Sequence, residues 1–478
     1  MFSATRRLIL TLERQTARPL ARRLASTNAK TLPPRRTGTL AVAAGAVSLA
    51  GAGLVWKSRT GDDIPSLDAP PAPYTSFLPP ELSSDDVTRI LSKNAFSVAP
   101  RNIAGLTRYD GAQVASNSPC EDHLVHGAIA SPRGDGSQWA VWAVLDGHAG
   151  AETADVLSRA LVPFVQHRLK ETFQNDKTDT AAVEKSIAQS FVDLDKEIMN
   201  AAIAAPTTNA TLARKVQTML PAFAGSCALL ALYDADTGRL HVACTGDSRA
   251  VIGRQASGGA WETLPPTIDQ TGYNADEVAR LQKEHPGEET MVQDGRVLGL
   301  AVSRAFGDGR WKWPLDFQTD IKRRFYAPPP LTPRYDVRTP PYLTAEPVVT
   351  TVRVEPGQPC VLILATDGLW DHMKSSQAVD LVGNWLEPSS VKVDADTEED
   401  VPDGPFDFGH FWKGVSYKFQ PERTVVKDEN AAVHLIRNSL GGNHGEMLAG
   451  RVAFGLPHSR RLRDDVTVQV ALFNCGKK

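Results

Sequence analysis

The sequence predicts an α+β fold, a central sandwich of two antiparallel β-sheets flanked by helices. Three observations support this prediction. Short apolar segments separated by turn residues follow one another in the middle of the chain, as in a strand meander. Longer segments carry apolar residues three and four positions apart, which is typical of amphipathic helices. Strand–helix–strand units of the kind that build a doubly wound parallel sheet are in the minority.

The expected elements can be placed along the chain from these patterns. The strands are 139–145, 226–233, 240–245, 250–253, 348–354, 360–365 and 466–473. The helices are 149–165, 180–204, 275–285, 376–386 and 430–440. Asn274 and Glu277 form the N-x-x-E variant of a capping box at the start of the third helix. The Pro-rich segment 326–342 and the acidic segment 391–405 are expected to be surface insertions.

Composition excludes several classes of protein. The chain has 478 residues, of which 42% are hydrophobic, enough for a substantial core. Residues 1–36 contain nine Arg and Lys residues against the single Glu13, a local charge of +8, so the net charge of −3 leaves −11 for the rest. An acidic body argues against nucleic-acid binding. The cysteines, which are expected to be reduced, form no CxxC pair or even framework, so neither a zinc site nor a disulfide scaffold is predicted.

The first eighty residues read as targeting and attachment segments. Residues 1–36 are Arg-rich and acid-poor, which predicts a mitochondrial transit peptide; a basic tail that binds nucleic acid or anionic lipid is the alternative. Residues 37–56 are uncharged and long enough to cross a bilayer, which predicts a transmembrane helix in the inner membrane; a flexible linker is the alternative. Flanking charges favour an N-terminus on the matrix side. Residues 57–80 form a linker, and 81–478 form the globular body.

Acidic residues stand at the ends of several apolar strands. Asp146 ends the run 139–145, and Gly147 lets the backbone approach whatever the carboxylate holds. Asp-Gly alone is more often a turn. However, further acidic groups border other strands: Glu121-Asp122, Asp367 with Asp371, and Asp464-Asp465. Carboxylates at buried strand ends repel one another unless a cation lies among them, so the sequence predicts a centre for Mg²⁺ or Mn²⁺.

Such a centre suits the hydrolysis of phosphate esters. Two cations neutralise the phosphate oxygens and lower the pKa of the water between them, so that water rather than a side chain attacks phosphorus. The departing alkoxide of serine or threonine needs a proton, which a histidine can supply. His148 is the candidate because it stands two residues after Asp146. The histidines His123, His241 and His372 are interpreted as structural.

A series of motifs occurs in a fixed order along the chain. They are Glu121-Asp122, Asp146-Gly147-His148, Gly225-Ser226, Gly246-Asp247-Ser248-Arg249, 300–308, Asp367-Gly368-Leu369-Trp370-Asp371 and Arg463-Asp464-Asp465. Over roughly residues 100–474 this series resembles the metal-dependent PPM (type 2C) protein serine/threonine phosphatases. Each motif is weak by itself, but all of them in this order are specific. Longer strings, such as 109–113, 304–308 with 311–313, 340–347 and 441–443, resemble the mitochondrial pyruvate dehydrogenase phosphatase branch.

The resemblance implies that two Mn²⁺ or Mg²⁺ ions, with a weaker third, are bound by the carbonyl of Gly147 and by six carboxylates: Glu121, Asp146, Asp247, Asp367, Asp371 and Asp464. Asp146 would bridge the two main ions. Asp367 and Asp464 would complete the shell of one ion, and Glu121 with Gly147 that of the other. Asp247 and Asp371 match the positions that hold the third ion.

The resemblance also implies catalytic roles. His148 matches the general acid, and Asp122 would orient a water on the ions. Asn117 stands where many relatives have a phosphate-binding arginine; the pyruvate dehydrogenase phosphatase branch also has asparagine there, so the amide would act as a neutral donor. Asp464 is taken as the ligand and Asp465 as its neighbour.

The implied activity is hydrolysis of phosphoserine or phosphothreonine on a protein by a hydroxide that bridges the ions. The branch suggests the pyruvate dehydrogenase E1α subunit in mitochondria as the substrate. Two alternatives belong to other classes: a catalytically silent phosphatase fold that serves as a binding module, and a small-molecule metallophosphatase. The first is disfavoured because every predicted acidic ligand is present. A kinase is disfavoured because the order at 305–308 is Ala-Phe-Gly-Asp rather than Asp-Phe-Gly.

Overall fold

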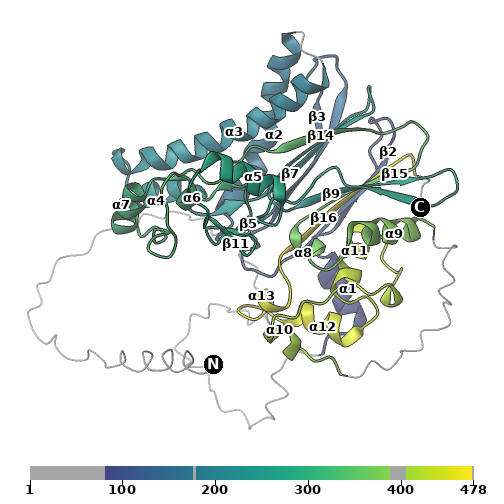
Figure 1. Ribbon diagram of the computed structural model, residues 1–478. Coiled ribbons are helices and arrows are strands. Elements are labelled where there is room, and N and C mark those ends of the chain that lie inside the picture. The colour runs from purple at the N-terminus through teal and green to yellow at the C-terminus, as the bar shows by residue number, and fades with distance from the viewer. Residues whose placement is uncertain (1–80, 176–178, 388–404, 476–478) are drawn as a thin grey trace, which may run out of the picture. The chain divides into compact units, whose positions relative to one another are not determined.

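The computed structural model describes residues 81–175, 179–387 and 405–475. In this part of the chain two antiparallel sheets stack face to face, and helices cover both outer faces (Figure 1). The predicted α+β sandwich is therefore confirmed. The predicted transit peptide 1–36, transmembrane helix 37–56 and linker 57–80 lie outside the described residues. Within the described ranges, none of the helices is both long and apolar enough to cross a membrane.

The first sheet has six antiparallel strands in the order β1-β2-β16-β15-β9-β10. Their bounds are Phe96–Val98, Leu106–Val114, Val466–Phe473, Cys360–Ala365, Arg249–Gln255 and Trp261–Leu264. The strand that is last in sequence, β16, lies in the middle between β2 and β15. Every residue of β16 and β15 is buried because both faces of this sheet are covered.

The second sheet has five antiparallel strands in the order β14-β8-β7-β4-β3. Their bounds are Val348–Arg353, Arg239–Thr245, Ala228–Asp234, Gln138–Leu145 and His123–Ala130. Side chains of β4 alternate between two cores. Trp142 faces the first sheet, where it meets Tyr109 and Phe473 edge to face with ring centroids 5.7 and 6.1 Å away. Trp139 and Val141 face the helices instead, which explains why β4 is apolar throughout after the exposed Gln138.

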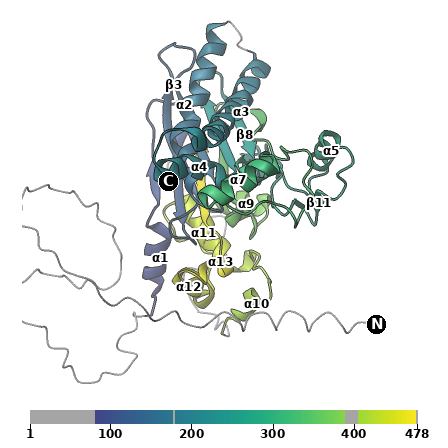
Figure 2. The same ribbon diagram turned by 90° about the vertical axis from the view of Figure 1, so that its left-hand side faces the viewer.

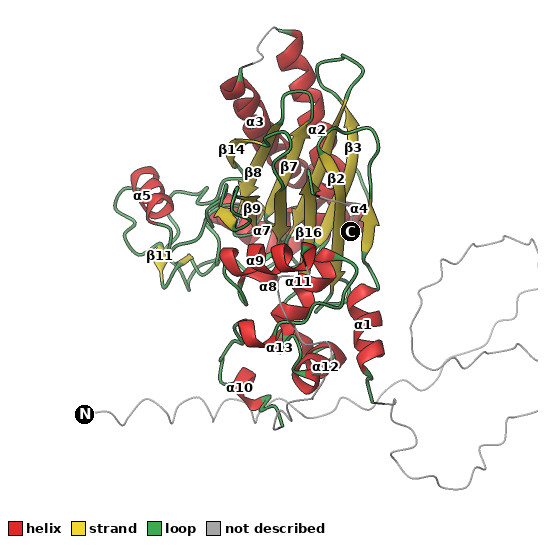
Figure 3. Ribbon diagram, turned by 90° about the vertical axis from the view of Figure 1, so that its right-hand side faces the viewer, coloured by secondary structure: helices red, strands yellow, loops and turns green. Residues whose placement is uncertain are grey.

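Helices pack on both sheets. The second sheet is covered by α2 (Glu152–Gln174), α3 (Thr180–Ala204) and α4 (Leu212–Phe223). The first sheet is covered by α1 (Ser84–Ser92), α9 (Ser375–Leu386), α11 (Ala431–Leu440) and α12 (Gly445–Ala453). In Figure 3 the strands form the yellow centre and the helices surround it in red. The order of layers is helix, sheet, sheet, helix.

A small lobe with its own core projects from the side of the sandwich (Figure 2). It contains α5 (Ala275–Glu284) and the hairpin of β11 (Val292–Gln293) and β12 (Arg296–Val297). Leu331, Val337 and Tyr342 are buried in the lobe core. The prediction that 326–342 is a surface insertion was therefore wrong in part, because its apolar residues anchor the segment. Most of the predicted acidic insertion 391–405 lies outside the described residues.

The start of α5 corrects another prediction. The side chain of Asn274 accepts a hydrogen bond from the backbone N–H of Asp276 at 3.0 Å, so the predicted cap is present. Glu277 does not complete a capping box. Its carboxylate accepts hydrogen bonds from Ser303 and Arg304 instead. The Glu277 carboxylate therefore forms buried contacts with Ser303 and Arg304 rather than a local hydrogen bond with the start of the helix.

Candidate metal centre

Three aspartates that follow different strands meet at one end of the sandwich. Asp146 follows β4, Asp247 lies between β8 and β9, and Asp367 opens the short helix α8 (Asp367–Trp370) after β15. One carboxylate oxygen of each lies within 4.8 Å of the other two. We call Asp146, Asp247 and Asp367 the aspartate trio. Carboxylates this close repel one another, so their grouping fits a divalent cation with oxygen ligands.

Repulsion within the trio is reflected in the pKa values. Burial and then Asp367 raise the pKa of Asp146 well above its ordinary value. Burial, Asp247 and Asp464 do the same to the pKa of Asp367. The Oδ2 atom of Asp146 is buried, and no described residue donates a hydrogen bond to it. Mg²⁺ or Mn²⁺ would satisfy this oxygen and neutralise its neighbours, so the residues present fit the predicted ions.

Glu121 and Gly147 approach each other through the backbone. A Cβ atom at Gly147, in β5 (Gly147–His148), would lie 2.2 Å from the carbonyl oxygen of Glu121, so this contact requires glycine. The Glu121 carboxylate accepts hydrogen bonds from Asn117 Nδ2 at 2.6 Å and from the backbone N–H of Gly150 at 2.7 Å. Asn117, the predicted phosphate donor, therefore uses an amide hydrogen to hold a predicted metal ligand.

Asp465 and Asp122 fix the loop that carries Glu121. The Asp465 carboxylate accepts backbone hydrogen bonds from the loop 116–121, including that of Glu121 at 2.8 Å. Burial alone would raise the pKa of Asp465, but these donors outweigh it, and the pKa is lowered. The buried Asp122 accepts a hydrogen bond from Thr467 Oγ1 at 2.7 Å, and burial followed by Asp465 raises its pKa. Both aspartates join the loop to the start of β16.

Asp464 lies beside the trio and is held by an arginine. Its Oδ1 atom accepts hydrogen bonds from the backbone N–H of Asp465 at 2.7 Å and from Arg460 Nη1. Arg460, in the short helix α13 (Ser459–Leu462), also places Nη2 3.7 Å from Glu121 Oε2. Burial raises the pKa of Asp464, and Arg460 opposes this shift. Sequence reasoning missed Arg460, which belongs to none of the motifs.

Asp371 lies outside the trio, although the family resemblance assigns it, together with Asp247, to a third ion. It ends α8, where its backbone N–H donates to the carbonyl of Asp367 at 2.8 Å, and its side chain is exposed. The charge of Asp371 contributes to the raised pKa of Asp367. Asp247, by contrast, lies directly beside Asp146 and Asp367. The roles of these residues in metal binding stay predictions.

His148 faces an aspartate that sequence reasoning did not select. A three-stranded sheet of β5, β6 (Gly225–Ser226) and β13 (Phe306–Gly307) places His148 Nε2 2.7 Å from Asp308 Oδ2. Burial alone would lower the pKa of His148, but Asp308 outweighs it, and the pKa is raised. A Cβ atom at Gly225 would lie 2.1 Å from His148 Nε2, so this contact requires glycine. The motif 300–308, which ends at Asp308, was the available signal.

Comparison with protein families decides where this arrangement belongs. The model of the protein phosphatase 2C family matches residues 111–397, more than half of the chain. The chain belongs to the protein phosphatase 2C family. The matched segment contains the whole aspartate trio and His148 and ends before Asp464. The resemblance drawn from the sequence motifs is therefore confirmed.

Related proteins extend the protein phosphatase 2C match toward both ends. A protein phosphatase 2C homologue of Schizosaccharomyces pombe is 38% identical over an alignment of 422 residues, and the match covers 86% of this chain and 91% of that protein. The mitochondrial pyruvate dehydrogenase (acetyl-transferring) phosphatase 1 of Saccharomyces cerevisiae is 34% identical and covers 77% of this chain and 69% of its own. The human mitochondrial pyruvate dehydrogenase (acetyl-transferring) phosphatase 2 is 32% identical, with coverages of 77% and 78%.

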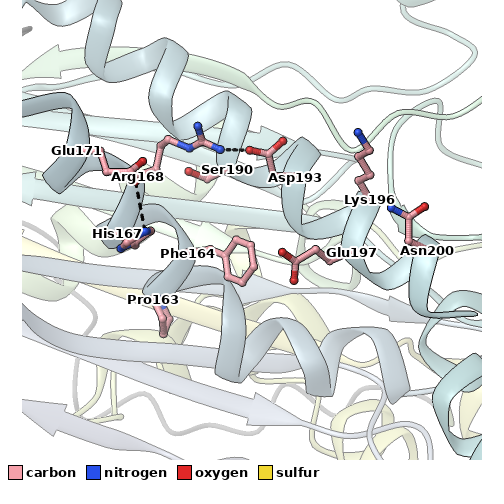
Figure 4. Close-up of a pocket in the computed structure, with 10 residues that line it drawn as sticks. All are labelled: Pro163, Phe164, His167, Arg168, Glu171, Ser190, Asp193, Lys196, Glu197 and Asn200. Carbon is pink, nitrogen blue, oxygen red and sulfur yellow. Dashed lines mark hydrogen bonds and ion pairs between the residues drawn. The ribbon is translucent and has the colours of Figure 1, made fainter. Parts of the chain in front are cut away.

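A groove on this protein phosphatase 2C chain lies away from the metal centre. It has a volume of about 720 Å³ and runs between α2 and α3 (Figure 4). An ion pair between Arg168 and Asp193 joins the two helices across it, and His167 lies 3.5 Å from Glu171. None of the predicted site residues lines this groove. Its mixed charges are those of a solvated helix interface.

Two of the three histidines predicted to be structural, His241 and His372, are buried and hydrogen-bonded in this protein phosphatase 2C domain, whereas the buried Nδ1 of His123 has no partner among the described residues. His241 is buried against Trp139, and its Nδ1 lies 2.8 Å from Thr351 Oγ1. His372 is buried with its Nδ1 2.8 Å from the carbonyl of Tyr417. All five cysteines are free, as predicted: Cys120, Cys227, Cys244, Cys360 and Cys475.

Proposed function

We propose that this chain is a Mn²⁺- or Mg²⁺-dependent protein phosphatase that hydrolyses phosphoserine and phosphothreonine. The main observation behind the proposal is the aspartate trio, in which the buried Oδ2 of Asp146 accepts no hydrogen bond from the described residues. Divalent ions at the trio would neutralise the phosphate and lower the pKa of a water for attack on phosphorus. Asp464, Glu121 and the carbonyl of Gly147 complete the proposed ligand set, with Asp247 and Asp371 available to a third ion.

The remaining residues position the reacting groups. Asp308 holds the imidazole of His148 through the 2.7 Å contact and favours its charged form. His148 then gives its proton to the departing serine or threonine oxygen. Asp122 orients the attacking water, and Asn117 keeps the Glu121 carboxylate in place while its second amide hydrogen is available to the phosphate.

We place the substrate among mitochondrial phosphoproteins, with the pyruvate dehydrogenase E1α subunit as the leading candidate. Two observations support this choice: the names of the yeast and human relatives, and the composition of residues 1–36.

In this proposal residues 37–56 tether the domain to the inner membrane. Alkaline extraction of mitochondria and protease protection of mitoplasts test the tether, and a soluble domain enclosed in the matrix would refute it.

The activity is tested with the purified full chain and Mn²⁺ on a phosphoserine peptide. We expect hydrolysis that Asp146→Asn abolishes. If neither protein hydrolyses the peptide, the chain is a binding module. If sugar phosphates are hydrolysed as fast as the peptide, it is a small-molecule metallophosphatase.

Phosphoproteomics of mitochondria with and without the chain tests the substrate, because E1α phosphorylation should rise in its absence.

A further inference from the structure

The negative charge at the proposed metal centre, together with that of a bound phosphate, is larger than the charge of two divalent ions. Five acidic side chains surround the ion positions: Glu121, Asp146, Asp247, Asp367 and Asp464. A phosphate monoester brings a further charge of about −2 near neutral pH. Two divalent ions balance most of the carboxylate charge and little of the phosphate charge. A basic side chain at the rim would therefore favour binding of the phosphate.

Arg460 is placed to supply this charge. Its guanidinium contacts Asp464 through Nη1 and lies 3.7 Å from Glu121 Oε2 through Nη2, so it spans two proposed ligands. Its side chain is 38% exposed, so a ligand from solvent can reach it. Two other cations that lie near Asp371 have partners of their own. Arg249 pairs with Asp269 at 2.6 Å, and Lys418 donates to the backbone carbonyl of Asp371.

The backbone under Arg460 is anchored to the centre. Ser459 Oγ donates to the carbonyl of Ser116 at 2.6 Å, and Arg463 Nη2 donates to the carbonyl of Ala115 at 2.9 Å. Both ends of α13 are therefore tied to the strand end and loop that lead to Glu121. Figure 1 shows α13 with α10 (Gly409–Trp412) and α12 below α8, the helix that Asp367 opens. The side chain of Arg460 can change partner without movement of this backbone.

We propose that Arg460 exchanges its carboxylate partners for the phosphate of the substrate when divalent ions occupy the centre. Ions held by Asp464 and by Glu121 would neutralise the two carboxylates that hold the guanidinium. The planar guanidinium then pairs with two phosphate oxygens. Arg460 is thus a phosphate-binding residue that competes with the ions for the carboxylates in their absence. This inference rests on the proposed phosphatase function.

Arg461 provides a matched control on the same helix. Its guanidinium carbon lies over the ring of Trp412, 4.1 Å from the ring centroid, so it has a different partner from Arg460. Arg460→Ala and Arg461→Ala remove the same charge from adjacent positions. Arg460→Lys keeps the charge but loses the two-pronged contact. Melting temperatures of the variants establish that each is folded.

The test is calorimetric binding of inorganic phosphate to the full chain at saturating Mn²⁺, together with the Mn²⁺ titration itself. For Arg460→Ala we expect the Kd for phosphate to rise about tenfold or more, and Mn²⁺ to bind as tightly as in the unaltered chain or more tightly. For Arg460→Lys we expect an intermediate rise, and for Arg461→Ala a change of less than about twofold.

Two results would overturn the inference. One is an unchanged phosphate affinity in Arg460→Ala. The other is a loss of phosphate affinity that follows weakened Mn²⁺ binding, because Arg460 would then only position Asp464. Peptide hydrolysis by the unaltered chain separates the two proposals. Phosphate binding that depends on Arg460 without any hydrolysis would sustain this inference and reject the phosphatase function.

Discussion

The imidazole of His148 and the carboxylate of Asp308 form one hydrogen-bonded unit, with Nε2 and Oδ2 2.7 Å apart. The two residues are 160 positions apart in the sequence, and the short strands β5, β6 and β13 bring them together. The carboxylate fixes the orientation of the ring and stabilises its charged form. In the proposed function, this contact prepares His148 to donate a proton beside the proposed metal centre.

Replacing His148 tests its role as a proton donor. We expect His148→Gln to slow hydrolysis of a phosphoserine peptide by roughly 10²-fold. Hydrolysis of 4-nitrophenyl phosphate should change little, because nitrophenolate leaves without a proton. Asp308→Asn should show the same selective loss with a smaller magnitude. The measurement is kcat on both substrates, and equal losses on both would argue against a proton-donor role.

Replacing Asp146 tests the electrostatics of the trio. In EDTA we expect Asp146→Asn to melt at a higher temperature than the unaltered chain, because one of three repelling carboxylates has become neutral. With Mn²⁺ at about 100 times Kd, the unaltered chain should gain about 2.7 kcal/mol per site, and the variant much less. Thermal unfolding with and without Mn²⁺ measures both effects. A variant that melts lower in EDTA and keeps the full Mn²⁺ response would refute this account.

Gly225→Ala tests the space around His148. The added Cβ would lie 2.1 Å from His148 Nε2 and 2.3 Å from Asp308 Oδ2, so the pair must separate. We expect peptide hydrolysis to fall by more than about tenfold, within the limit set by His148→Gln. Gly258→Ala is the control, because a Cβ there meets nothing within 4 Å. If both variants retain full kcat on the peptide, the contact is not needed.

His241 makes the fold sensitive to acid. Burial lowers its pKa from 6.5 to about 4, so the folded chain binds fewer protons than the unfolded chain between these values. The free energy of unfolding therefore has its full value above pH 6.5. It decreases as the pH drops toward 4, and His241 accounts for at most about 3 kcal/mol of this decrease. We expect His241→Phe to show a shallower fall in denaturant unfolding with EDTA present. An identical pH slope in both proteins would contradict this.

Much of the fold could be predicted where side chains of one kind follow a clear period. The predicted helix 180–204 and the predicted strands 360–365 and 466–473 coincide with α3, β15 and β16. Helix α2 begins at Glu152 and continues to Gln174, beyond the predicted 149–165, because buried Leu169 and Phe173 extend its apolar stripe past Val165. By contrast, α4 was missed because it carries Pro221 in its last turn.

The candidate metal ligands could be predicted from the sequence, but the residues that contact Glu121 and His148 from distant parts of the chain could not. Asp146, Asp247 and Asp367 stand in motifs at strand ends, and the structure groups them. Arg460 and Asp308 act through space on residues far away in the chain, Glu121 and His148. The motif 300–308 marks Asp308 but does not name its partner, because both contacts depend on how β16 and β13 pair with their neighbours.

The central position of β16 links the completion of the first sheet to the completion of the proposed metal centre. Asp464 and Asp465 directly precede this strand, which pairs with both β2 and β15. Until residues 464–473 have left the ribosome, a nascent chain lacks both a proposed ligand and the middle of its first sheet. A premature stop ahead of Asp464 would therefore yield an inactive polypeptide with unpaired strand edges, prone to aggregate, and no partly working enzyme.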